Sequence, residues 1–209
     1  MLKRRSEKGD TLIEVLFAFT ILSLIVVGSV SIMNQGTKAA QRSLETTLVS
    51  QQIEAQATTL RFLHDAYIAE FQAGATYSSA TPAGQWKLMS DSMTAKPITS
   101  ATNVIGAAAC PAPASGSFIL DSVNAKFIST GSGKFTPAPA IAEVVYDGSP
   151  ESLNVTQGIW IEGIRSVTEV DANKKNVRYI DFHIMACWQS PGQGLPQTIA
   201  TIVRLNEPR

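Results

Sequence analysis

Residues 9–14, Gly-Asp-Thr-Leu-Ile-Glu, join a short basic segment to a long apolar one. From Leu12 to Val27 the apolar stretch contains a single ionisable side chain, the carboxylate of Glu14. A carboxylate in the middle of a membrane-spanning helix costs about 2.5 kcal/mol or more to insert, so it needs a specific partner. The stretch therefore predicts a helix that enters a membrane and uses Glu14 for a contact there.

This motif resembles the N-terminal signal of type IV pilins and pseudopilins, in which a glycine is followed usually by Phe and then by Thr-Leu-Ile/Val-Glu. Here Asp10 stands in the place of the phenylalanine. Aspartate suits the first position of a helix, because its carboxylate accepts hydrogen bonds from free N–H groups. The resemblance implies that residues 1–9 are a leader, that a prepilin peptidase cuts between Gly9 and Asp10, and that Asp10 is then methylated.

The resemblance also implies a function and a set of partners. The chain would be a minor pilin, a structural subunit of a type IV pilus-like filament and not an enzyme. Residues 10–34 would cross the membrane and then form the filament core, where Glu14 would attract the amino terminus of a neighbouring subunit and set its register. The partners would be other pilin subunits, the prepilin peptidase and an inner-membrane assembly platform.

Other interpretations of the N-terminal segment remain open. A single-pass anchor needs about 20 apolar residues, and Leu12 to Met33 supplies that length. A cleaved secretory signal would need small residues at its end, for which Gly28-Ser29 is a weak match. The chain could therefore be a membrane-anchored extracellular binding domain that never polymerises, or a pseudopilin of a type II secretion or DNA-uptake system. Neither a plain anchor nor a cleaved signal accounts for Glu14 five residues after Gly9.

The distribution of charge predicts the topology. The first nine residues hold four of the 17 bases and one of the 17 acids, so the rest of the chain carries 13 bases and 16 acids. By the positive-inside rule the basic end stays in the cytoplasm, and the domain after the span lies outside, at the cell surface or in an extracellular filament. A mildly acidic body also argues against a broad nucleic-acid surface.

The helix is predicted to continue well beyond the apolar span, from about Thr11 to about Phe71. No proline occurs before Pro82, and apolar residues recur at spacings of three and four. This apolar stripe consists of Val49, Ile53, Ala57, Leu60, Leu63, Tyr67 and Phe71. We therefore expect residues 35–73 to pack on a globular domain.

Residues 74–157 are rich in Ala, Ser, Thr, Gly and Pro and contain many turn signals. They are predicted to form a variable loop region with short strands at Ser117–Leu120, Ala125–Ile128 and Ile141–Tyr146.

Residues 158–209 are predicted to form an antiparallel sheet of three strands, Gly158–Thr168, Val177–Trp188 and Gln197–Leu205. In the middle strand the even-numbered residues from Ile180 to Trp188 share one face, and the odd-numbered residues from Tyr179 to Cys187 share the other. We expect the even-numbered face to pack on the helix stripe, which gives an α+β fold of the type IV pilin kind.

The two cysteines, Cys110 and Cys187, lie in the part predicted to be outside the cytoplasm, where a disulfide is the default. By the strand alternation Cys187 points away from the helix. A bond to Cys110 would therefore hold the Pro-rich loop over the outer face of the sheet. The alternative is two buried thiols.

No catalytic, metal or cofactor pattern is evident. The histidines, His64 and His183, have no metal-ligand spacing with the cysteines, and Ser115 lacks a nucleophile elbow. Asp171 and Asn173 do not complete a calcium loop and are interpreted as a solvated turn. The remaining basic cluster, Lys174, Lys175 and Arg178, is also interpreted as a solvated turn.

Overall fold

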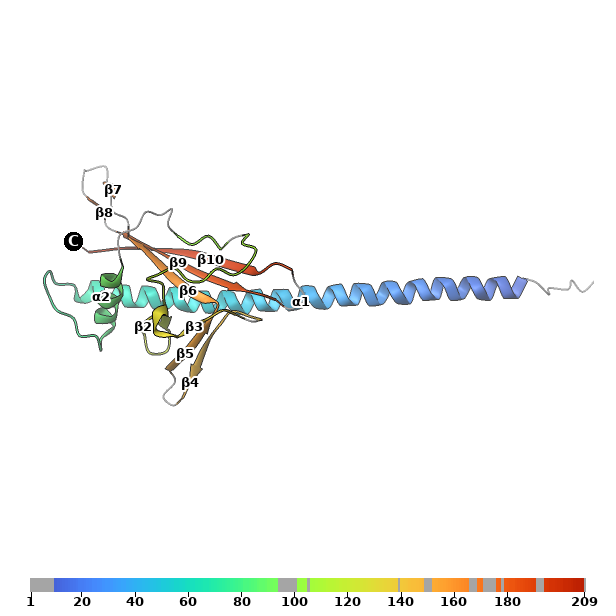
Figure 1. Cartoon of the computed structure of the whole chain (residues 1–209), viewed down its shortest axis with the longest axis horizontal. Coiled ribbons are helices and arrows are strands. Elements are labelled where there is room, and N and C mark those ends of the chain that lie inside the picture. Colours follow the sequence, from blue (N-terminus) through green and yellow to red (C-terminus); the bar gives the residue numbers. More distant parts are fainter. Residues whose placement is uncertain are drawn as a thin grey trace, which may run out of the picture. The chain divides into compact units, whose positions relative to one another are not determined.

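The computed structural model describes residues 10–93, 101–104, 106–138, 140–148, 152–165, 169–170, 176–177, 179–190 and 194–208. Its main elements are one long N-terminal helix and an antiparallel sheet near the C-terminus (Figure 1). This confirms the α+β class predicted from the sequence.

Helix α1 spans Asp10–Glu70, a single run of 61 residues and roughly 90 Å at 1.5 Å per residue. Its ends lie within one residue of the predicted ones. The helix continues through Gly28 and Gly36 without a break. It ends before Gly74, which has a positive φ of 80°.

The chain divides into two compact units, one ending at Leu44 and the other beginning at Glu45. We had placed the start of the packing half at residue 35. Side chains from residue 35 to Leu44 are exposed, and Glu45 is the first buried residue of the helix. The second unit therefore begins where α1 first has side chains to pack against.

The principal sheet lies in the second unit and has five strands in the order β10-β9-β6-β1-β2. Its strands are β1 (Phe118–Asp121), β2 (Lys126–Ser129), β6 (Ile159–Arg165), β9 (Tyr179–Trp188) and β10 (Gln197–Asn206). The predicted meander of β6, β9 and β10 is confirmed, since both pairings are antiparallel. The loop region also contributes, because β1 pairs with β6 and β2 pairs with β1.

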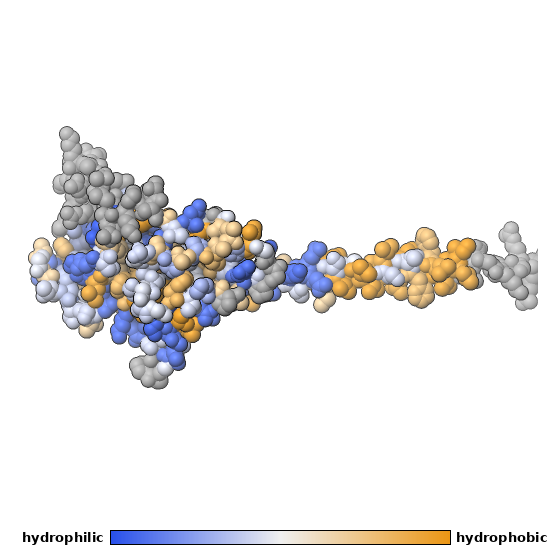
Figure 2. Space-filling model, in the orientation of Figure 1, coloured by the Kyte–Doolittle hydropathy of each residue, from blue (hydrophilic) through white to orange (hydrophobic). Residues whose placement is uncertain are grey.

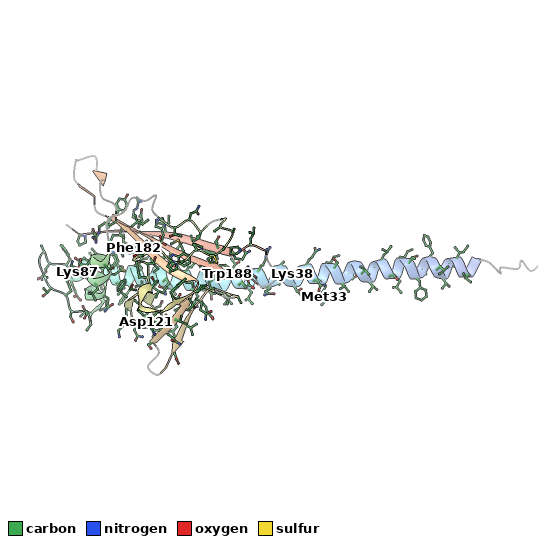
Figure 3. The ribbon with its side chains drawn as sticks, viewed as in Figure 1. Met33, Lys38, Lys87, Asp121, Phe182 and Trp188 are labelled. Atoms are coloured by element: carbon green, nitrogen blue, oxygen red, sulfur yellow. A yellow bond between two sulfur atoms is a disulfide. The ribbon has the colours of Figure 1, made fainter. Side chains whose placement is uncertain are left out.

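The core forms between this sheet and the second half of α1. Six of the predicted stripe residues, from Val49 to Tyr67, are buried, and Phe71 packs against them at the edge. The even-numbered residues of β9 belong to the same cluster, among them Phe182 and Trp188 (Figure 3). The odd-numbered residues Met185 and Cys187 form a second cluster on the opposite face. The predicted alternation of β9 is thus confirmed.

A second helix, α2 (Pro82–Ser92), was not predicted. Thr81 caps its N-terminus by accepting a hydrogen bond from the Gly84 N–H, and proline occupies the first turn. Trp86 and Met89 of α2 are fully buried in the main core. Helix α2 therefore adds packing to the part of the chain that we had interpreted as loop.

A smaller three-stranded sheet has the order β3-β5-β4. It consists of β3 (Phe135–Thr136), β4 (Glu143–Asp147) and β5 (Ser152–Gln157), and a short 3-10 helix, Thr130–Ser132, precedes it. A pairing of β7 (Glu169–Val170) with β8 (Asn176–Val177) follows β6. The strands predicted in residues 74–157 are confirmed as β1, β2 and β4, whereas β3, β5 and the 3-10 helix were not predicted.

Gly158 makes the sharp connection from β5 to β6. Its φ is +67°, and a Cβ there would overlap the carbonyl oxygen of Cys187 and the side chain of Ala138. The residue must therefore be glycine for this turn to lie against Cys187 of β9 and Ala138.

Candidate functional site

The apolar residues of the first unit are exposed in the isolated chain. Phe17 is 67% and Leu24 is 74% exposed, and Figure 2 shows an almost continuous apolar surface along this part of α1. By length and composition this is a helix that could cross a membrane. An apolar surface of this kind requires lipid or other helices around it.

Three hydroxyl groups within this segment, those of Thr20, Ser23 and Ser29, are bonded to the helix itself. Ser23 Oγ donates to the carbonyl of Phe19, and Ser29 Oγ donates to the carbonyl of Ile25. Thr20 Oγ1 bonds the carbonyls of Leu16 and Phe17. Because these groups are satisfied within the helix, they add little to the cost of placing it in an apolar environment.

Glu14 lies in the first turns of α1 with an exposed side chain. In the described part of the chain no ion pair involves its carboxylate. Asp10 is the first residue of the helix. The other residue of the predicted cleavage site, Gly9, lies outside the described residues.

At the start of the second unit, Glu45 is 7% exposed, and its Oε2 accepts a hydrogen bond of 3.2 Å from Trp188 Nε1. This contact joins the first buried turn of α1 to the end of β9. Glu45 lies four residues before Val49, the first residue of the apolar stripe. The acid is buried because an indole N–H at the edge of the core needs an acceptor.

Gln56 is a second polar side chain inside the helix–sheet interface, and it is 1% exposed. Its Nε2 donates to the Leu120 carbonyl at 2.8 Å, and its Oε1 accepts from the Leu120 N–H at 2.9 Å. Strand β1 needs these bonds because it pairs with β6 only at Phe118 and Ile161. Beyond that point Gln56 supplies the hydrogen bonds that a neighbouring strand would make.

Asp121 organises the turn between β1 and β2 and is 2% exposed (Figure 3). It accepts hydrogen bonds from the backbone N–H groups of Val123, Asn124 and Leu153 and from the Asn124 side chain. Burial alone would raise the pKa of Asp121, but these hydrogen bonds outweigh it and hold the pKa below its usual range. The Leu153 contact also ties the principal sheet to β5.

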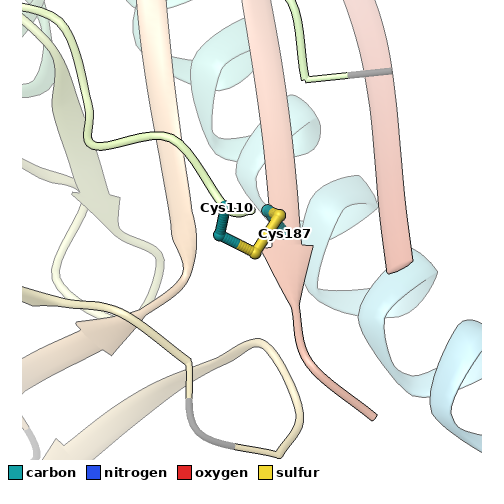
Figure 4. The surroundings of a disulfide bond; sticks show 2 residues. All are labelled: Cys110 and Cys187. Atoms are coloured by element: carbon teal, nitrogen blue, oxygen red, sulfur yellow. A yellow bond between two sulfur atoms is a disulfide. The ribbon is translucent and has the colours of Figure 1, made fainter. Parts of the chain in front are cut away.

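Cys110 and Cys187 are joined by a disulfide, with 5.5 Å between their Cα atoms (Figure 4). Cys187 lies on the outer face of β9 in a small buried cluster with Val104, Trp160 and Met185. The bond therefore attaches the segment around Cys110 to the face of the sheet that is opposite α1, as the strand alternation predicted.

A buried carboxylate supports the same covering segment. Glu162 of β6 is 6% exposed and accepts hydrogen bonds of 3.0 Å from Trp160 Nε1 and from the Thr102 backbone N–H. It thereby orders the chain eight residues before Cys110. The sequence contains no signal for this contact, because Thr102 and Glu162 are far apart along the chain.

Both histidines are part of the packed domain. His64 Nε2 lies 2.8 Å from the Asn206 carbonyl, and the imidazole ring contacts the indole ring of Trp86 edge-on. His183 lies on the outer face of β9, directly opposite Glu162 of β6. In the described part of the chain no cluster of His, Cys, Asp and Glu could hold a metal ion. Asp171, Asn173, Lys174, Lys175 and Arg178 lie outside the described residues.

Comparisons with known proteins identify no relative. No protein-family model, curated protein or solved structure matches the chain.

Proposed function

We propose that the chain is a minor subunit of a type IV pilus-like filament, inserted in the inner membrane as a precursor and cleaved after Gly9. Assembly then proceeds through the apolar first part of α1. The protein acts as a structural element with its C-terminal domain outside the cytoplasm. Its partners are sibling subunits, the prepilin peptidase and the assembly platform.

One observation carries the proposal: the pilin-like motif of residues 9–14 stands at the start of a helix with two different surfaces. The helix begins at Asp10, so the scissile bond would directly precede it. The apolar side chains of its first part are exposed, whereas its second part packs on an antiparallel sheet. A filament subunit needs both surfaces, one for assembly and one to hold its exposed domain.

Glu14 provides the specific contact between neighbouring subunits during assembly. In the low dielectric of a membrane, its carboxylate attracts the positively charged amino terminus that cleavage creates on a neighbouring chain. The pairing relieves the cost of keeping either charge in an apolar environment. It also favours one axial position of the two helices, so it sets the register of the incoming subunit.

The test is processing in the native cell. Mass spectrometry of membrane and filament fractions should find Asp10 as the first residue, with or without an added methyl group. Gly9→Ala should block cleavage, whereas the matched variant Gly28→Ala, at a glycine inside the helix, should be processed normally. An intact leader on the membrane protein, with no protein in the filament fraction, would contradict the proposal and favour a membrane-anchored domain that does not polymerise.

A further inference from the structure

The described strand edges of this fold differ in how they are protected from pairing with another chain. Strand β2 has four residues, and the Phe127 N–H is occupied by Gln85 Oε1 of α2 at 2.9 Å. Strand β4 contains an irregularity after Val145 and begins and ends with an acid, and β3 has two residues. Short strands, bulges and charges all discourage edge pairing. These three edges are therefore protected.

In the part of the chain that the structure describes, strand β10 has none of these protections. It forms the other edge of the principal sheet and pairs with β9 over ten consecutive residues without a register shift. It contains no proline or lysine, and its single charged side chain, Arg204, forms two hydrogen bonds with Asp181 of β9. The length, regularity and composition of β10 are those of a strand that accepts another strand.

The direction of the backbone groups of β10 follows from its neighbours. The Cys187 N–H donates to the Gly158 carbonyl at 2.9 Å, in line with the β6–β9 register. Odd-numbered residues of β9 therefore bond β6, and even-numbered ones bond the odd-numbered residues of β10. Thr198, Ala200 and Ile202 must then direct their N–H and C=O groups away from the sheet. The Asn206 carbonyl agrees, because it bonds His64 instead of β9.

The side chains beside this edge are apolar and incompletely covered. Ile202 is 58% exposed on the outer face of the sheet. On the α1 face Ile199 and Leu205 are only partly buried at the margin of the main core. An added strand would cover both rows, and uncharged, alternately apolar side chains fit beside them.

We propose that the outer edge of β10 is a docking site for an extended, uncharged segment of a different polypeptide, which binds by strand addition. The backbone groups of Thr198, Ala200 and Ile202 form the hydrogen bonds, and Ile199 and Ile202 contact the side chains of the incoming strand. Specificity comes from the apolar alternation, because the backbone bonds are the same for any sequence.

The inference that the partner is a different polypeptide rests on the proposed function. The description of the β10 edge does not depend on that function. Two copies of the chain could pair their β10 strands through a two-fold axis only if the two strands were antiparallel. The two domains would then point in opposite directions. Copies that enter one membrane through the same end share one direction. The opposite edge of a second copy, β2, is short and occupied by Gln85. A second copy of the chain is therefore excluded as the partner.

The test uses the full chain in detergent and a fluorescent ten-residue peptide with the sequence of β9, in which serine replaces Cys187 and asparagine replaces Asp181, so that no acidic side chain remains. This peptide has the side-chain alternation that β10 already accepts on its inner edge. Fluorescence anisotropy should show saturable binding. Hydrogen exchange on the unmodified protein should show slower exchange at the amides of Thr198, Ala200 and Ile202 when the peptide is in excess.

A pair of variants at one position tests the backbone contact. Ala200→Pro removes an outward N–H without touching the bonds to β9, and should weaken peptide binding about tenfold or more. Ala200→Ser keeps the N–H and should bind like the unmodified chain. Hydrogen exchange at the amides of Thr198, Ala200 and Ile202 is measured on the unmodified chain. It therefore tests the proposal even if Ala200→Pro does not fold.

Three results would overturn the proposal: no saturable binding, unchanged exchange at all three amides, or dimers of the chain that Ala200→Pro abolishes. Leader cleavage of the unmodified chain in cells is measured separately, next to the peptide binding of the same chain. Normal cleavage together with absent peptide binding would reject the docking site and leave the filament function standing. Absent cleavage together with normal peptide binding would reject the filament function and leave the docking site standing.

Discussion

The side-chain amide of Gln56 on α1 bonds both backbone groups of Leu120 on β1, so a helix residue completes the hydrogen bonding of a strand. The pairing spans 64 residues of sequence and lies inside the core. It holds β1 in the sheet at the point where β1 separates from β6. Polar groups in such a position must be satisfied, because water cannot reach them.

Replacing Gln56 by alanine should therefore destabilise the domain by about 2 kcal/mol or more, because the N–H and C=O of Leu120 lose their partners in a buried site. Urea unfolding of a fragment beginning at Gln35 measures the loss. Gln51→Ala, on the exposed side of the same helix, is the matched control and should change stability little. Equal stability of the two variants would show that Gln56 has no such role.

Asp121 should make the domain sensitive to acid. Its pKa is lowered in the folded chain, so its contribution is fully present above the unfolded value of about 3.9 and is lost as the pH falls through the lowered folded value. Urea midpoints measured from pH 6 to pH 2 should fall below about pH 4. Asp121→Asn should lower stability at neutral pH by about 1–3 kcal/mol and flatten this dependence. An unchanged pH profile in the variant would assign the acid sensitivity to other groups.

Glu14→Ala should leave membrane insertion intact, since it removes a charge from the apolar segment, but it should impair entry into filaments. Blots of membrane and sheared-filament fractions compare the two steps. Thr20→Ala, which removes a hydroxyl already bonded within the helix, is the control and should assemble normally. Incorporation of Glu14→Ala at the level of the unmodified chain would refute a role in register.

Thiol titration of the unreduced domain under denaturing conditions should find no free thiol, since Cys110 and Cys187 are bonded to each other. Replacing both by alanine should reduce stability by roughly 4 kcal/mol at most, the chain-entropy value for a loop of this length. Most of the local change should appear as faster hydrogen exchange between Thr102 and Ser117. Two reactive thiols in protein from the native cell would contradict the assignment.

Exchange in α1 should be fastest from Gly28 to Gly36. Each glycine weakens a helix by about 1 kcal/mol relative to alanine, and neither has a neighbouring side chain to support it. Amides of Leu16–Val26 and Val49–Leu63 are the internal references in detergent. Uniform protection across the three stretches would show a continuous, equally stable helix.

The elements predicted well from the sequence are those whose periodicity extends over many residues. The stripe from Val49 to Phe71 repeats over six helical turns, and β9 alternates over ten residues, so each face could be assigned. The strands β1, β2 and β4 were predicted to within two residues of their ends, but the helix α2 and the strands β3 and β5 were missed. Short strands of small residues carry little periodicity, although Thr81-Pro82 was a usable signal for the start of α2.

The polar contacts of the core were the other omission. Gln56, Glu45 and Glu162 look like solvent-facing residues in the sequence, yet each is buried against a partner at least 60 residues away. Such pairs depend on where the chain returns after long loops, and a single sequence does not contain that information. The motif of residues 9–14 was evident because its chemistry is local.

The disulfide also bears on how the chain is made. With two cysteines in the whole sequence, only one intramolecular bond can form, so oxidative folding involves no choice among pairings and no reshuffling by an isomerase. Cys110 leaves the ribosome 77 residues before Cys187, and β1, β2 and β6 are synthesised in that interval. The bond can therefore close only after all of these strands have been synthesised, and β10 follows Cys187 in the chain.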